Sequence, residues 1–173
     1  MIHAKPFTVL LAAFALLPIA QVATGDEPAA AADQVDAVLV VKSERKLYLL
    51  KAGRVTRAFD VSLGLVPTGP KRREGDFRTP EGRYELETRN PNSDYFLSIR
   101  VSYPNDADRA RARAAGVDPG GQIMIHGLPN EPRYDPKHYK GADWTDGCIA
   151  VSNSDMVDIW LMTHESTPIE IRP

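Results

Sequence analysis

The chain has 173 residues, of which 43% are hydrophobic and 25% are charged, and its formal net charge is −2 at pH 7. This composition is typical of one globular domain that is large enough to bury a core. A chain without a strong excess of lysine and arginine lacks the charge that phosphate binding requires, so nucleic acid is excluded as a partner.

The first residues differ in composition from the rest. Lys5 supplies a positive charge, an apolar run of about fourteen residues follows over 7–20, and small and acidic residues come next. This pattern predicts a secretory signal peptide over 1–25 that is removed after export. The apolar run is shorter than the ~20 residues of a spanning helix, so no stable membrane insertion is expected after cleavage. We therefore expect secretion across the inner membrane, to the periplasm or the cell wall.

The segment 26–35 is rich in alanine and acidic residues and predicts a flexible lead-in. From Asp36 onward, short runs rich in β-branched and aromatic residues recur at regular spacing. They cover 38–41, 47–50, 55–63, 84–88, 96–103, 123–126, 149–151 and 169–171. The series predicts one domain over 36–173 that is mostly β, built as a sandwich or barrel whose first strands form a meander of hairpins.

Two segments between these runs are predicted to be helical. Residues 105–115 are rich in alanine and arginine, begin with Asn-Asp as the cap, and are followed by Gly116, which can end a helix in the left-handed conformation. Residues 153–164 follow Ser152 as N-cap and carry one apolar face. We therefore predict one short helix on the surface and one packed against the core.

The segment 67–80 is dense in glycine, proline and charge. It predicts an irregular loop of a length that is often functional. The loop contains a basic run of three residues, Lys71, Arg72 and Arg73. We interpret this run as a solvated turn, with anion binding as the alternative.

Cys148 is the sole cysteine, so no disulfide can form within the chain. A thiol is mostly protonated at neutral pH, with an unperturbed pKa near ~8.5, and becomes an effective nucleophile beside a base. His126 ends an apolar run 22 positions earlier. The intervening chain can return to a neighbouring strand about 4.8 Å away. The pattern predicts Cys148 as nucleophile and His126 as its base, with His138 in the intervening loop as a rival base.

The residues before the cysteine suggest supporting roles. Gly147 has no side chain, so a substrate carbonyl can approach the backbone, and the amides around Gly147 and Cys148 are candidates for an oxyanion hole. Thr145 is expected to support this turn or to donate its hydroxyl. A metallohydrolase is disfavoured, because the chain has no His-Glu-x-x-His motif.

Together these motifs resemble the L,D-transpeptidase (YkuD-like) family. The shared features are His126-Gly127 after an apolar strand, Thr-Asp-Gly-Cys over 145–148 before a short strand and a helix, T-P-E-G-R-Y over 79–84, and V-S-L-G over 61–64. The resemblance covers 36–173. It implies an L,D-transpeptidase-like β fold.

The resemblance also implies cysteine-dependent acyl transfer on the peptide stems of peptidoglycan. In this scheme a cysteine thiolate attacks the peptide bond after meso-diaminopimelate, the terminal D-alanine leaves, and an amine resolves the thioester. His126 would take and return the protons while the Gly127 carbonyl orients its ring. No metal or organic cofactor is implied. The implied partners are peptide stems and, as another acceptor, a wall-attached protein.

Two positions depart from the family's pattern. Asp146 stands where many members have a second histidine, and Ala150 stands where many have an arginine that grips a substrate carboxylate. Other side chains must then bind the substrate. The candidates are Arg133, Lys137 and Lys140 in the loop after His126, together with Tyr84.

Two other interpretations stay open. A hydrolytic relative would use the same thioester and resolve it with water, as an L,D-carboxypeptidase or as an amidase that removes peptide or protein links from the wall. A non-catalytic peptidoglycan-binding module would keep the fold alone. The presence of both Cys148 and His126 argues against such a module.

Overall fold

The computed structural model of the chain describes Met1 and residues 34–173. Residues 2–25 of the expected signal peptide and 26–33 of the expected lead-in therefore lie outside the described residues. Val35 is already buried, and its N–H donates to the Met162 carbonyl at 2.9 Å. The prediction of a flexible lead-in is therefore wrong for Val35, because this residue packs in the core, and the packed part of the described chain begins one residue before the predicted 36.

Eight strands form one sheet in the order β3-β2-β1-β8-β4-β5-β6-β7. The strands are β1 (Ala37–Val41), β2 (Lys46–Lys51), β3 (Arg54–Asp60), β4 (Gly82–Ser93), β5 (Phe96–Val101), β6 (Met124–His126), β7 (Ile149–Ala150) and β8 (Pro168–Arg172). The first three form the predicted antiparallel meander. Two neighbouring pairs are parallel, β1 with β8 and β6 with β7. The predicted fold class, mostly β with two short helices, is confirmed.

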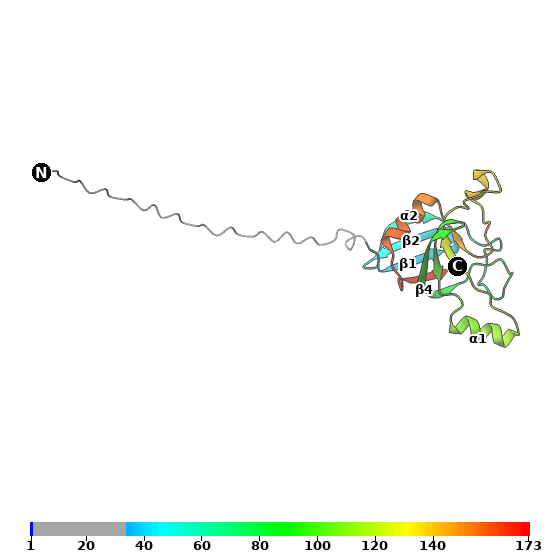
Figure 1. Cartoon of the computed structure of the whole chain (residues 1–173). Helices are drawn as coiled ribbons and strands as arrows, with labels where there is room; N and C mark the ends of the chain where they lie inside the picture. The colour runs from blue at the N-terminus through cyan, green and yellow to red at the C-terminus, as the bar shows by residue number, and fades with distance from the viewer. Residues whose placement is uncertain (2–33) are drawn as a thin grey trace.

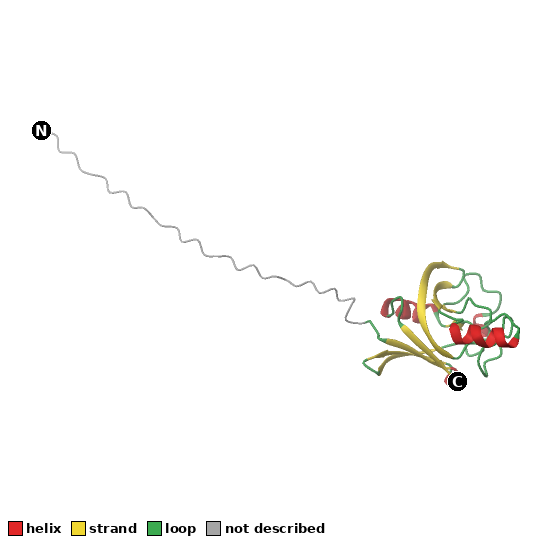
Figure 2. Cartoon of the chain, turned by 90° about the horizontal axis from the view of Figure 1, so that it is seen from below, coloured by secondary structure: helices red, strands yellow, loops and turns green. Residues whose placement is uncertain are grey.

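The long strand β4 joins the two halves of the sheet. Its first residues pair with β8, and its later residues pair with β5 through two shifts of register. Such irregularities bend a strand and increase its twist. Figure 2 shows long strands that curve over the rest of the domain, as these shifts in β4 would produce.

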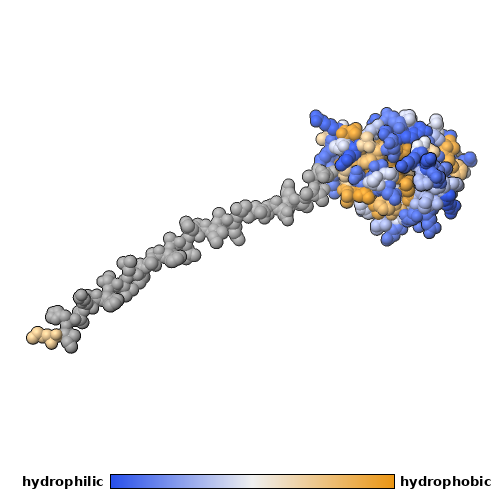
Figure 3. Space-filling view, turned by 90° about the horizontal axis from the view of Figure 1, so that it is seen from above, coloured by the Kyte–Doolittle hydropathy of each residue, from blue (hydrophilic) through white to orange (hydrophobic). Residues whose placement is uncertain are grey.

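The core follows the alternation of the strands. Val38 and Val40 of β1 are buried, as are Leu47 and Leu49 of β2, while the residues between them are half-buried. Burying an aliphatic side chain stabilises the fold by roughly 1.5–3 kcal/mol, so these alternating positions fix the register of the strands. The outer face seen in Figure 3 is mainly hydrophilic and is interrupted by apolar patches.

The helices α1 (Asp106–Ala115) and α2 (Asn153–Met162) lie apart from each other (Figure 1). Asn105 caps α1, and Gly116 ends it at φ 67°, as predicted. Helix α2 packs against β5 and ends two residues earlier than the predicted 164, because Thr163 has an extended backbone. No helix within the described residues is both long and apolar enough to cross a membrane.

The loop over 67–80 is irregular, as predicted, but one member of its basic run is not solvated. Lys71 is only 5% exposed, and its Nζ donates to Asp76 Oδ1 at 2.9 Å and to the Arg73 carbonyl at 3.1 Å. The prediction of a solvated turn is therefore wrong for Lys71, because a carboxylate five residues later pairs with it. Arg72 and Arg73 are exposed.

Candidate active site

The predicted nucleophile lies at the start of an outer strand of the sheet. Cys148 directly precedes β7 and is partly exposed, and its Sγ donates to the Gln122 carbonyl at 3.5 Å. Burial raises the pKa of the thiol, and the charge of Asp146 adds to this effect. The Met124 amide and the Lys71 ammonium act in the opposite direction. The thiol is therefore protonated in the resting protein at neutral pH.

The predicted base is the last residue of β6. His126 is 5% exposed, and its Nδ1 lies 2.7 Å from the Gly127 carbonyl. A carbonyl oxygen can only accept a hydrogen bond, so Nδ1 carries the proton and Nε2 keeps its lone pair. Burial lowers the pKa of His126 to about 4, although the Gly127 carbonyl partly offsets the change. The imidazole is therefore neutral at pH 7 and can accept a proton.

Parallel pairing of β6 with β7 relates these two residues. Ile125 pairs with Ile149 and His126 with Ala150, so the register continued by one residue sets Cys148 opposite Met124. Side chains alternate along a strand, so Cys148 and His126 share a face, about 4.8 Å apart across the strands and about 6.6 Å along them. Within residues 34–173 no hydrogen bond joins Sγ to the imidazole. The two residues thus share a face of the sheet without a hydrogen bond between their side chains.

Thr145 organises the turn before the cysteine. Its Oγ1 donates to the Cys148 carbonyl at 2.8 Å and accepts from the Gly147 N–H at 3.1 Å. The Gly147 N–H is thus already used, whereas the Cys148 N–H has no acceptor among the residues that the structure describes. The structure therefore leaves the Cys148 amide, and not that of Gly147, available to an oxyanion.

Gly147 has a different use from the one predicted. Its φ is +135°, and a Cβ at this position would lie 2.7 Å from the Arg78 carbonyl. No side chain fits between these two backbones. The glycine therefore allows the turn to pack on the loop 67–80, and it does not expose the backbone to a substrate.

Tyr84, a predicted substrate-binding residue, lies in the core. It is 5% exposed, and its hydroxyl is 3.0 Å from Asp108 Oδ2. Its ring meets Tyr103 edge to face at a centroid distance of 6.0 Å. The prediction is wrong, because the hydroxyl is satisfied by a buried carboxylate and the ring by a packed neighbour.

The other predicted residues lie on the loop between β6 and β7. Arg133, Lys137, His138 and Lys140 are all exposed. The ring of His138 packs on Tyr134 at a centroid distance of 4.5 Å and on Tyr139 at 5.4 Å. Lys140 lines a separate cavity of about 700 Å³ whose walls include neither the thiol nor the predicted base. The structure does not bring these four side chains to Cys148.

Aromatic residues that the sequence did not indicate surround the imidazole. The ring centroid of His126 lies 4.6 Å from Tyr95 and 5.8 Å from Trp144, and Tyr139 packs edge to face on Trp144 at 5.0 Å. These rings remove water from the imidazole, which explains its lowered pKa. The sequence could have indicated Trp144 as a site residue, because it stands next to Thr145. It could not have indicated Tyr95, because that residue comes from the β4–β5 hairpin, far from His126 along the chain.

The arrangement has the parts of a nucleophilic catalyst. A thiol with an open backbone amide precedes the start of β7, and a neutral imidazole oriented by a carbonyl stands at the end of the parallel neighbour β6. Within residues 34–173, no three His, Cys, Asp or Glu side chains come together as metal ligands. The chemistry that these groups support is attack on a carbonyl with formation of a thioester.

Comparison with known proteins points in the same direction. The family model of the YkuD L,D-transpeptidase catalytic domain matches residues 36–171. The Escherichia coli (strain K12) protein YafK is 37% identical over 99 residues, which cover 52% of this chain and 37% of YafK. The chain thus spans little more than a third of the length of this curated relative.

Two solved structures share the fold. The helical cell shape determining protein Pgp2 from Campylobacter jejuni superposes with a TM-score of 0.59 and 30% identity, over 80% of this chain and 48% of that chain. An L,D-transpeptidase from Xylanimonas cellulosilytica gives a TM-score of 0.51 and 18% identity, over 80% of this chain and 61% of that chain. The second likeness concerns the fold alone.

Proposed function

Because the chain belongs to the L,D-transpeptidase catalytic-domain family, we propose that it catalyses cysteine-dependent acyl transfer on the peptide stems of peptidoglycan. The observation that carries the proposal is the parallel pairing of β6 with β7. It puts Cys148 and His126 on one face of adjacent strands, with the imidazole held by the Gly127 carbonyl.

In the first half of the reaction, His126 Nε2 takes the thiol proton as Sγ attacks the carbonyl carbon of meso-diaminopimelate. A C–S bond forms and the carbonyl electron pair moves to oxygen, where the Cys148 N–H can donate to it. When the intermediate collapses, the C–N bond breaks. The leaving D-alanine takes the proton back from His126, and a thioester remains on Cys148.

In the second half, an amine of another stem, or of a wall-attached protein, attacks the thioester. The imidazole accepts the proton of the amine, and the thiol recovers it when the C–S bond breaks. Water in place of the amine would give hydrolysis with the same residues. The product therefore identifies the acceptor.

The protonation states support a base mechanism in place of a preformed ion pair. Burial favours the neutral form of both Cys148 and His126. Proton transfer then accompanies attack and does not precede binding.

We further propose that the protein acts outside the cytoplasm, in the periplasm or at the wall. The support is the apolar run over 7–20, and the peptide stems are found in the same compartment. The similarity to a cell shape determining protein supports a role in cell shape. This wider role is part of the proposal.

The test is incubation of the full chain with a tetrapeptide stem ending in meso-diaminopimelyl-D-alanine, with and without an amine acceptor. We expect D-alanine release and an acceptor-linked product, both abolished by Cys148→Ala and by His126→Gln. His138→Gln is the matched control and should keep the activity. Release without linked product would indicate the hydrolytic alternative. Binding without release would contradict the proposed reaction.

A further inference from the structure

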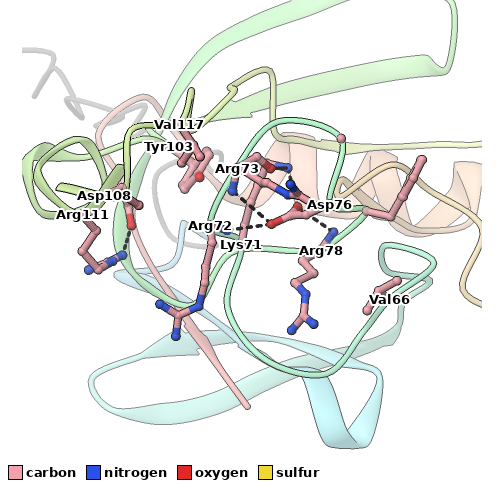
Figure 4. A pocket seen from close by; sticks show the side chains of 13 residues that line it. Val66, Lys71, Arg72, Arg73, Asp76, Arg78, Tyr103, Asp108, Arg111 and Val117 are labelled. Atoms are coloured by element: carbon pink, nitrogen blue, oxygen red, sulfur yellow. Dashed lines mark hydrogen bonds and ion pairs between the residues drawn. The ribbon is translucent and has the colours of Figure 1, made fainter. Parts of the chain in front are cut away.

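A basic cavity lies between the loop 67–80 and α1 (Figure 4). Its volume is about 620 Å³, and its walls include five basic and two acidic residues. The whole chain, by contrast, has a net charge of −2. Positive charge is therefore concentrated at this one hollow of the surface, where it can attract an anion.

The two acidic residues are already occupied. The Asp76 carboxylate accepts from Lys71 Nζ and from three backbone amides of its own loop, and its pKa is lowered. Asp108 pairs with Arg111 and accepts from the Tyr84 hydroxyl. Neither carboxylate neutralises the remaining cations of the cavity.

Three guanidinium groups consequently have no carboxylate partner within the described part of the chain. They belong to Arg72, Arg73 and Arg78. In Figure 4 the side chains of Arg72 and Arg78 extend in the same direction, away from Asp76. The Asp76 carboxylate fixes the loop backbone, because it binds the amides of all three arginines. The cations are therefore presented on a rigid loop.

The cavity adjoins the turn that carries the thiol. The Arg78 carbonyl packs directly against Gly147, and the Phe77 carbonyl packs against Gly64 beside the same glycine. Burial raises the pKa of Cys148, and the ammonium of Lys71, on the cavity wall, acts weakly in the opposite direction. The loop that forms the cavity wall therefore packs directly on the turn that precedes the thiol.

We infer that this cavity binds the free carboxylates of the peptide stem next to the bond that Cys148 attacks. The inference rests on the proposed function. Planar guanidinium groups match carboxylates in two-pronged geometry, and the cavity also has an apolar wall of Val66, Phe77 and Val117. The site supplies the carboxylate grip for which the sequence offers no arginine at position 150.

The test compares the wild-type chain with the double variant Arg72→Gln/Arg73→Gln, whose two side chains make no ion pair with a carboxylate of the described residues. Arg57→Gln/Arg113→Gln is the control, because it removes the same charge at exposed positions outside the cavity. The substrates are the free-acid tetrapeptide and an analogue with amidated carboxylates.

The cavity variant should raise KM for the free acid about tenfold, as loss of one charge-assisted contact would, and change KM for the amidated analogue little. The control should stay within about twofold. Equal alkylation of Cys148 by iodoacetamide in all proteins would show that the turn is intact. An unchanged KM for the free acid, or an equal rise in the control, would overturn the inference.

A binding measurement separates this inference from the proposed function. Calorimetry with Cys148→Ala measures the dissociation constant of the free-acid peptide without any turnover. One outcome is that the triple variant Cys148→Ala/Arg72→Gln/Arg73→Gln does not bind the peptide while the wild type releases no D-alanine. This outcome would support the cavity as the carboxylate site and refute the proposed reaction. The opposite outcome is that the wild type releases D-alanine while the triple variant binds the peptide as well as Cys148→Ala does. It would support the proposed reaction and refute the cavity as the carboxylate site.

Discussion

Burial of the His126 imidazole predicts that the stability of the protein depends on pH through this residue. The side chain is 5% exposed, and its pKa is lowered to about 4 from an ordinary value of 6.5. In the unfolded chain the imidazole is in water and titrates near ~6.5. Between these two pH values the unfolded state binds more protons than the folded state. The free energy of unfolding therefore falls as pH falls from about 6.5 to about 4.

The magnitude follows from the gap between the two pKa values. Each pKa difference of one corresponds to about 1.4 kcal/mol, so the full effect is about 3 kcal/mol, of which about 2 kcal/mol is lost between about pH 7 and pH 4.5. Asp76 and other carboxylates with lowered pKa values also lose stability in acid. Their contribution is the same in a variant that lacks only the imidazole.

Equilibrium urea unfolding of the wild type and of His126→Gln at these two pH values isolates the effect. We expect the wild type to lose about 2 kcal/mol more than the variant. His164→Gln replaces an exposed histidine and should behave as the wild type. Equal losses in the wild type and His126→Gln would refute the burial of a neutral imidazole.

Three further predictions concern the turn and the core. Thr145→Val should lower the free energy of unfolding by about 2 kcal/mol, because two hydrogen bonds are lost at about 1 kcal/mol each, and should slow D-alanine release. An unchanged free energy of unfolding in urea together with an unchanged rate of release would contradict this prediction. Gly147→Ala should cost about 1–3 kcal/mol in strain at φ +135° and abolish release, since its Cβ meets the Arg78 carbonyl; a normal melting temperature would argue against this. Tyr84→Phe should cost about 1 kcal/mol by losing its bond to Asp108 and leave kcat/KM unchanged; a tenfold loss of activity would return Tyr84 to the site.

Local patterns predicted the strands and helices well. Alternating apolar residues marked β1 and β2, and Asn105 with Gly116 marked both ends of α1. These signals act over a few residues, so a single sequence contains them. The end of α2 was misplaced because Thr163 leaves the helix without a glycine or proline to announce it.

Long-range pairings could not be predicted from the same patterns. The parallel pairing of β1 with β8 joins the two ends of the domain, and nothing in either strand specifies the other. Lys71 looked solvated because its partner, Asp76, lies in a loop without periodicity. Tyr84 was assigned to the site by motif, while its environment is set by Asp108 on α1. Motifs thus suggested the candidate catalytic residues but not the packing around them.

The proposed reaction requires that the sulfur of residue 148 form a covalent bond to the stem. Intact mass spectrometry of the full chain, quenched in acid shortly after mixing with the tetrapeptide and followed by peptide mapping, measures this directly. We expect a tripeptidyl adduct on the peptide that contains Cys148, which hydroxylamine removes, and none on Cys148→Ala. An adduct on any other residue, or D-alanine release by the alanine variant, would contradict it.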